Sequence, residues 1–277
     1  RMYKNLYING CSFTKGHLLD EDKTWPYLLG KKLNLSLNNK AANSNSMQTI
    51  SDRTIMDLSN FLSPEIVHNK DTLVVIGLTW PGRQSVWFEN TIINLTINSV
   101  GVQERTAEDF RRYVMHRLGD SMSYSINNKI SDTESIKSLL TDDHEQANEK
   151  YFNTIKKYYS YLKEWVKNDD NWLRNQIIKY YLNIINLQSY FNENNIDYLF
   201  VRFQPIHDTF NTDKYPDLKP LIDKIDRSKI AAFRDEKSDP DRISNRNLVM
   251  DKSHPDANSC KIIAEDLETK IKEMYYE

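Results

Sequence analysis

Leu6-Tyr7-Ile8-Asn9-Gly10, near the start of the chain, is a short apolar run that stops at a glycine. The same arrangement returns at Leu73-Val74-Val75-Ile76-Gly77. Short apolar runs bounded by glycine are typical of strands buried in a parallel sheet. The glycines are informative because they are scarce. The chain has 7 of them in 277 residues, about a third of the usual frequency of ~7%. Both runs are therefore predicted to be central strands, each followed by a loop.

The rest of the chain alternates further strand patterns with helical patterns. Tyr198–Val201 is a third apolar run, and two weaker runs lie at 35–37 and 247–250. Apolar residues recur at helical spacing in the intervening segments, over residues 25–33, 50–62, 152–191 and 257–275. Strands that alternate with helices predict an open parallel sheet covered on both faces. We expect one α/β domain over residues 1–277, with a mostly helical insertion or lid at about 90–190.

Composition excludes several classes of protein. The net charge of −2 argues against a protein that coats nucleic acid, which needs a basic surface. Lysines and tyrosines interleave at residues 156–161, as in nucleic-acid grooves, but acidic neighbours favour amphipathic lid helices instead. No apolar stretch approaches the ~20 residues of a membrane span. We expect no nucleic-acid partner and no membrane span. The sequence does not indicate how many copies of the chain associate.

Cysteine and histidine usage predicts no metal site and no cofactor. Cys11 and Cys260 are too few for a disulfide framework or a four-ligand zinc site. The start of the chain has no signal-peptide pattern, and Arg1 before Met2 resembles the remnant of an expression tag. We expect a reduced, cytoplasmic protein. Its richness in Lys, Asn and Ile suggests an AT-rich genome, with a virus or another microbe as the source.

Two polar segments at opposite ends of the chain carry the chemistry. Gly10-Cys11-Ser12-Phe13-Thr14 follows the first strand, and Asp251-Lys252-Ser253-His254-Pro255 follows the last weak one. The carboxyl ends of parallel strands meet at one edge, where function gathers in such sheets. Asp251 could hold His254 so that its free ring nitrogen serves as a base for the Ser12 hydroxyl. The pattern indicates a nucleophile, a base and an orienting acid.

These segments resemble the sequence blocks of the SGNH (GDSL-type) hydrolase superfamily. Gly10-Cys11-Ser12-Phe13 is similar to the first block, Gly-Asp-Ser-Leu, and Asp251–Pro255 to the last, Asp-x-x-His-Pro. The resemblance implies a triad of Ser12, Asp251 and His254. It also implies a three-layer, flavodoxin-like sheet of five strands. The longer Gly-Cys-Ser-Phe-Thr-x-Gly pattern, with Trp25-Pro26 after it, looks like that of phage and microbial members.

The two middle blocks depart from the family pattern. Ser44, or alternatively Asn43, stands where the family has a glycine that donates a backbone N–H. Thr79 in Gly77-Leu78-Thr79 stands where it has an asparagine. The implied oxyanion hole is the Ser12 N–H, the Asn43/Ser44 turn and the Thr79 hydroxyl. Arg83 is the first candidate to compensate for the shorter Thr79, and Asn43 or Asn45 could also serve.

Simpler interpretations compete with each of these roles. Ser12 could only cap a helix, and Asp251 or Asp256 could cap the last one. Cys11 could be a nucleophile but is expected to point into the core, as is Cys260. Other residues at the predicted edge are expected to bind substrate or to pack within the protein; these are Trp80, Arg83, Trp87, Arg202 and Gln204.

The resemblance thus implies a serine esterase that removes an acetyl or other short O-acyl group. The substrate would be a small-molecule or glycan ester, and the reaction would pass through an acyl-enzyme. Two alternatives stay open. One is a catalytically impaired binding or assembly protein that keeps the scaffold, and the other is an O-acyltransferase.

Overall fold

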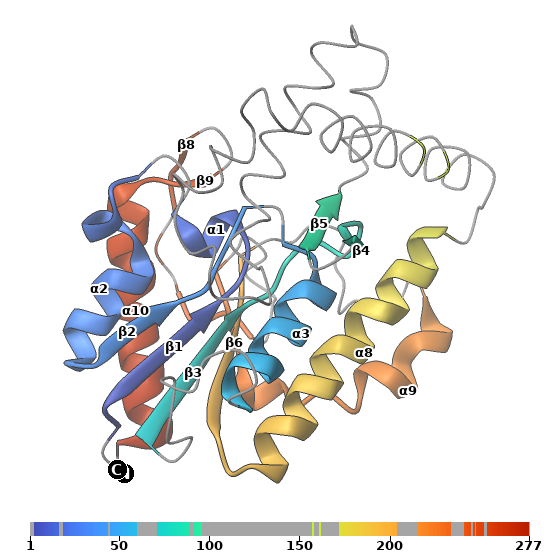
Figure 1. Cartoon of the computed structure of the whole chain (residues 1–277). Coiled ribbons are helices and arrows are strands. Elements are labelled where there is room, and N and C mark those ends of the chain that lie inside the picture. Colours follow the sequence, from blue (N-terminus) through green and yellow to red (C-terminus); the bar gives the residue numbers. More distant parts are fainter. Residues whose placement is uncertain are drawn as a thin grey trace, which may run out of the picture.

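A five-stranded parallel sheet forms the centre of the protein (Figure 1). The computed structural model describes residues 3–16, 19–43, 45–59, 71–88, 91–95, 157, 161, 172–203, 215–233, 241–244, 246, 248–251 and 254–276. The strands are β1 (Asn5–Asn9), β2 (Ser36–Asn39), β3 (Thr72–Gly77), β6 (Asp197–Arg202) and β7 (Ile230–Ala232). Their order is β2-β1-β3-β6-β7, which is the flavodoxin-like order of a doubly wound sheet.

Strand residues alternate between two hydrophobic cores, one on each face of the sheet. Leu6 and Ile8 of β1 pack with one core, whereas Tyr7 packs with the other. β3 is buried at all six residues, so its apolar run has no polar face. This continuous burial explains why the two glycine-bounded runs were recognisable in the sequence.

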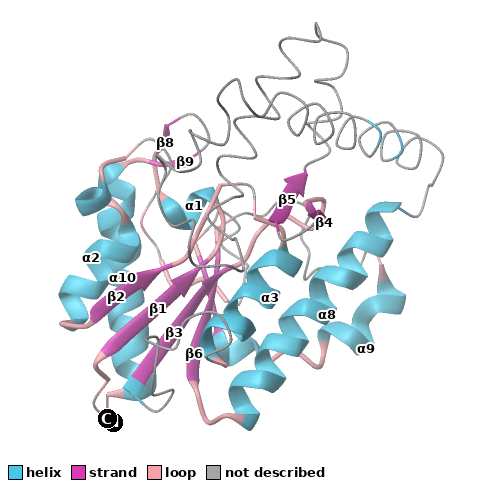
Figure 2. Ribbon diagram, in the orientation of Figure 1, coloured by secondary structure: helices cyan, strands magenta, loops and turns pink. Residues whose placement is uncertain are grey.

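Helices cover both faces, giving three layers (Figure 2). α2 (Trp25–Leu33) and α10 (Ala257–Tyr275) pack together on one face, and α3 (Met47–Leu58) and α8 (Trp172–Glu193) pack on the other. The shorter helices are α1 (Ser12–Lys15), α9 (Lys219–Ile222), η1 (Glu21–Lys23), η6 (Pro216–Leu218) and η7 (Arg227–Lys229). The predicted α/β class, with a flavodoxin-like sheet, is confirmed.

The prediction of the last strand was wrong. The fifth strand of the sheet is β7, and residues 248–249 are not in a strand. β8 (Met250–Asp251) instead pairs antiparallel with β9 (His254–Pro255) in a separate two-stranded ribbon. β7 escaped recognition because it has only three residues, Ile-Ala-Ala, too few to form a pattern.

The predicted insertion falls largely outside the described residues. One strand described by the structure lies just before residue 90, and a second strand and most of a helix lie inside the range. β4 (Gln84–Phe88) and β5 (Thr91–Leu95) form an antiparallel hairpin that the sequence did not predict, and α8 supplies residues from Trp172 onward. α8 packs against the sheet as one of its covering helices. Among the described residues, no helix has both the length and the apolar character needed to cross a bilayer.

Candidate active site

The loops after β1, β2 and β3 converge at the carboxyl edge of the sheet. α1 follows β1 directly and lies over the ends of β1 and β3. This close approach requires glycine, because a Cβ at Gly10 or Gly77 would lie 2.2 Å or 2.0 Å from the Thr14 hydroxyl. The glycines that end the two apolar runs therefore let α1 pack on the sheet and set the position of its first residue, Ser12.

Ser12 and His254 meet at this edge. The Ser12 hydroxyl lies 2.8 Å from Nε2 of His254, which is within ordinary hydrogen-bond distance. Ser12 is buried with 6% of its surface exposed, and His254 is partly buried in β9. A hydroxyl bonded to an imidazole nitrogen is the pairing of an activated serine nucleophile with its base.

The start of α10 holds His254 in place. Asp256 caps α10 by accepting a hydrogen bond from the Ser259 backbone N–H at 2.7 Å. The Ser259 hydroxyl donates to the Val249 carbonyl at 2.9 Å and accepts from the Val249 N–H at 2.7 Å. Both strands of the β8–β9 ribbon are thus tied to the start of the helix at the open end of the ribbon. Of the two capping candidates considered from the sequence, Asp256 is the residue that caps.

Asp251 lies beside His254 in the backbone. The two residues are cross-strand partners in the antiparallel β8–β9 pair, where side chains directly opposite each other are close. The side chain of Asp251 lies outside the described part of the structure. Its predicted role as the acid that orients the imidazole therefore stays a prediction.

Aromatic rings pack against the His254 imidazole. The Phe13 ring lies 4.8 Å from the His254 ring, centroid to centroid, and stacks on Phe203 at 6.0 Å. Trp25 is fully buried and donates its indole N–H to the Phe13 carbonyl at 3.1 Å. The Trp25 contact thus fixes the backbone directly after Ser12. This positioning role gives a structural reason for the Trp25-Pro26 pair in the sequence.

Thr79 and Arg83 meet at the end of β3. The Thr79 side chain is buried and accepts a hydrogen bond from Arg83 Nη1 at 2.8 Å. The same Nη1 lies 3.5 Å from the Asn45 carbonyl. Asn45 is fully buried, and its amide donates to the Gly10 carbonyl at 2.9 Å. Asn45 therefore links the loop after β2 to the loop after β1, a role that differs from the oxyanion donor considered for it.

The Asn43/Ser44 turn is described only in part. Asn43 Oδ1 is buried and has no hydrogen-bond partner among the described residues. Ser44, the other residue assigned to this turn, lies outside the described residues. The oxyanion role of the turn stays a prediction.

The strand order makes the fold flavodoxin-like, and the first and last sequence blocks meet at the carboxyl edge of the sheet, as the resemblance to SGNH hydrolases implies. No protein-family model matches this sequence, and no curated protein matches it.

Several solved structures are similar to this chain over nearly its whole length. One is described as a lipolytic protein of the G-D-S-L family from Desulfitobacterium hafniense DCB-2, with 15% identity, 96% of this chain and 99% of that chain covered, and a TM-score of 0.32. A carbohydrate esterase family 2 enzyme from Corynascus thermopiles (Myceliophthora fergusii) has 10% identity, coverages of 99% and 67%, and a TM-score of 0.46. TesA has 11% identity, coverages of 98% and 99%, and a TM-score of 0.42.

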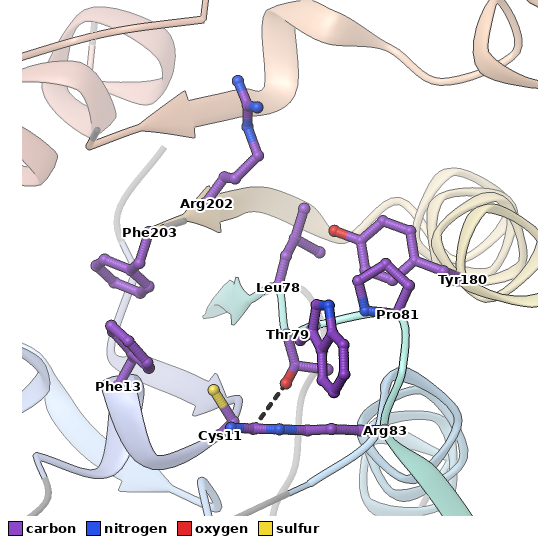
Figure 3. A pocket seen from close by; sticks show the side chains of 10 residues that line it. Cys11, Phe13, Leu78, Thr79, Pro81, Arg83, Tyr180, Arg202 and Phe203 are labelled. Atoms are coloured by element: carbon purple, nitrogen blue, oxygen red, sulfur yellow. Dashed lines mark hydrogen bonds between the residues drawn. The ribbon is translucent and has the colours of Figure 1, made fainter. Parts of the chain in front are cut away.

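A pocket opens at the same edge of the sheet (Figure 3). The Cys11–Phe13 turn, the loop after β3, the end of β6 and α8 line it, through Cys11, Phe13, Leu78, Thr79, Trp80, Pro81, Arg83, Tyr180, Arg202 and Phe203. Tyr180 was missed in the sequence because its place in a regular helical pattern gave no sign that it faces a pocket.

The structure places some of the predicted substrate-binding residues in this pocket and does not describe the others. Trp80 and Arg83 line it, and a Cβ at Gly82 would lie 2.5 Å from the Trp80 ring, so the ring packs on its own loop. Arg202 also lines the pocket, but its guanidinium lies 3.6 Å from the buried carboxylate of Asp241. Gln204 and the Trp87 side chain lie outside the described residues.

Both cysteines are buried, as expected. Cys11 borders the pocket, whereas Cys260 is enclosed in the core between α10 and the sheet. Burial raises the pKa of the Cys260 thiol to about 11, which keeps it neutral and unreactive. Within the described ranges, no cluster of three or more His, Cys, Asp or Glu side chains could hold a metal ion.

Proposed function

We propose that the protein is a serine hydrolase that cleaves carboxylic esters. The single observation that carries the proposal is the 2.8 Å contact between the Ser12 hydroxyl and His254 Nε2. In this proposal Ser12 is the nucleophile, His254 the general base and Asp251 the group that orients the imidazole.

The first half of the reaction makes an acyl-enzyme. The Ser12 oxygen forms a bond to the ester carbonyl carbon while its proton moves to His254 Nε2. The carbonyl π electrons move onto the oxygen, and the resulting oxyanion is met by the Ser12 N–H, the Asn43/Ser44 turn and Thr79. As the oxyanion collapses, the bond to the leaving alcohol breaks, and that alcohol takes the proton from His254.

Water completes the cycle. It gives a proton to His254 and attacks the acyl-enzyme, and the Ser12 oxygen leaves with that proton restored. The proposed substrate is a short O-acyl ester on a small molecule or a carbohydrate. The pocket next to the Ser12 turn supports a small group, because four aromatic rings line it, those of Phe13, Trp80, Tyr180 and Phe203.

The proposal is tested with p-nitrophenyl acetate and a fluorophosphonate. Wild-type protein should hydrolyse the ester much faster than Ser12→Ala does, and the fluorophosphonate should label one residue, Ser12. Equal rates for the two proteins, with no labelling, would contradict the proposal. Binding to acylated glycans without turnover would then favour the binding protein. That alternative is motivated by Thr79, which stands where the resembled family has an asparagine.

Transfer and hydrolysis share the acyl-enzyme, so product analysis separates them. The enzyme is incubated with an aryl acetate and a monosaccharide, and acetate and acetylated sugar are measured. A hydrolase should release acetate in proportion to the phenol. Acetylated sugar as the main product would show an acyltransferase instead.

A further inference from the structure

One guanidinium connects the loops that supply the proposed oxyanion hole. Arg83 Nη1 donates to the Thr79 hydroxyl at 2.8 Å in the loop after β3, and it lies 3.5 Å from the Asn45 carbonyl in the loop after β2. Asn45 continues the connection to the Gly10 carbonyl at 2.9 Å, in the loop after β1. Ser12, two residues beyond Gly10, is the proposed nucleophile.

The direction of the Thr79–Arg83 hydrogen bond has a chemical consequence. A guanidinium can only donate, so the Thr79 oxygen must be the acceptor. The Thr79 hydroxyl hydrogen is then directed to another acceptor. Thr79 shares the pocket with Cys11 and Phe13, the two residues on either side of Ser12, so that hydrogen is available where negative charge would form.

Charge adds to this arrangement. The guanidinium of Arg83 brings a positive charge to the pocket, and Figure 3 shows the hydrogen bond from this guanidinium to Thr79. Arg83 Nε is buried and has no hydrogen-bond partner among the described residues. A positive charge in a partly buried pocket stabilises a developing oxyanion more strongly than it would in water.

We propose that Arg83 is a positioning residue that turns Thr79 into the oxyanion donor and places positive charge beside it. The inference rests on the proposed esterase function and names a part of the machinery that function needs. A threonine is too short to replace an asparagine by itself. The Thr79–Arg83 pair would supply both the donor and the charge.

The test is a double-mutant cycle on p-nitrophenyl acetate hydrolysis. Arg83→Met and Thr79→Val should each lower kcat by about 10²-fold or more, the cost of a lost oxyanion donor, with little change in KM. The double variant should lose little beyond the worse single variant, because both residues act through one hydrogen bond. Arg174→Met is the matched control, since Arg174 pairs with Asp217 at the surface and should leave kcat unchanged.

Chemical rescue separates positioning from general support of the fold. Millimolar guanidinium added to Arg83→Ala should restore part of kcat, but it should not restore kcat in Arg83→Ala/Thr79→Val. Arg83→Lys should fall between wild type and Arg83→Met, because an ammonium keeps the charge but lacks the planar fork. Thermal melting identifies a variant that has failed to fold, in which case Arg83→Lys and its partner Thr79→Val carry the test.

Three results would overturn the inference. Arg83→Met could raise KM with kcat unchanged, which would make Arg83 a substrate-binding residue. The two single effects could multiply in the double variant, or guanidinium could rescue equally with and without the Thr79 hydroxyl. In each case wild type would still exceed Ser12→Ala, so failure of this inference is distinguishable from failure of the proposed function.

Discussion

The Ser12 hydroxyl and His254 Nε2 lie 2.8 Å apart although 242 residues separate them in the sequence. The sheet brings them together, because Ser12 follows β1 and His254 precedes α10. α10 packs on the face of the sheet to which Leu6 and Ile8 of β1 point. The contact depends on the whole fold and not on either segment alone. It links the two ends of the chain at the edge where the pocket opens.

Replacing either partner of this contact should abolish ester hydrolysis. Ser12→Ala and His254→Ala should each lower kcat/KM for p-nitrophenyl acetate by at least about 10³-fold, and the double variant should be no slower, because the residues act as a unit. Both variants should keep the wild-type melting temperature within a few degrees. Independent, multiplying losses would contradict the pairing.

Asn45 should matter for geometry and not through direct contact with substrate. Its amide donates to the Gly10 carbonyl at 2.9 Å from a fully buried position. Asn45→Asp replaces a donor by an acceptor facing that carbonyl, so the free energy of unfolding should fall by about 1–3 kcal/mol. Urea unfolding measures this loss. Asn194→Asp is the control, because the Asn194 amide donates to the Tyr190 carbonyl at 2.8 Å at an exposed position, where water can replace the lost hydrogen bond.

The main elements of the fold were predictable because burial leaves a pattern in the sequence. β1 and β3 are nearly continuous apolar runs, and the amphipathic pattern at 257–275 coincides with α10. β7 was not predictable, since its three residues, Ile-Ala-Ala, form an edge strand that is too short to show a strand pattern in the sequence. Its pairing with β6 is a property of the assembled sheet.

The candidate site was predictable in its residue types but not in its connections. Ser12 and His254 were found because their sequence blocks are distinctive. The Asn45 amide binds the Gly10 carbonyl in another loop, and Arg83 binds Thr79 within the loop after β3. Side-chain contacts of this kind leave no periodic pattern in the sequence, so they could not be predicted from it. Arg202 was assigned to the substrate because it ends a strand, and only the structure shows Asp241 beside it.

The close packing of Thr14 against two glycines predicts a selective rescue. A Cβ at Gly77 would lie 2.0 Å from Thr14 Oγ1 but 3.3 Å from Thr14 Cβ, whereas at Gly10 these distances are 2.2 Å and 2.7 Å. Gly77→Ala and Gly10→Ala should each destabilise the protein by about 1–3 kcal/mol or more through overpacking. Adding Thr14→Ala removes Oγ1 and should recover most of the loss at Gly77 only.

Urea unfolding of the four variants and of Thr14→Ala alone checks this prediction. Thr14→Ala should cost little by itself, because its hydroxyl is buried without a hydrogen-bond partner among the described residues. Equal rescue at both glycines would show that α1 shifts freely over the sheet. No rescue at Gly77 would show that the backbone, and not Oγ1, limits the space.

Cys260 should make the protein less stable in alkali within a defined pH range. Burial raises the pKa of its thiol from 9.0 to about 11, so the folded protein keeps this proton where the unfolded chain releases it. Unfolding therefore releases a proton between these values, and the free energy of unfolding falls as the pH rises from 9 to about 11. The slope from this one group is at most about 1.4 kcal/mol per pH unit.

Cys260→Ala removes this slope and leaves the other titrating groups in place. The variant should be less stable than wild type at pH 7, because it leaves a small cavity beside α10. The difference between the two proteins should shrink as the pH rises through the range set by the thiol, since only wild type loses the Cys260 contribution. Urea unfolding at a series of pH values measures the difference, and a difference that stays constant would show that the thiol ionises as readily in the folded core as in the unfolded chain.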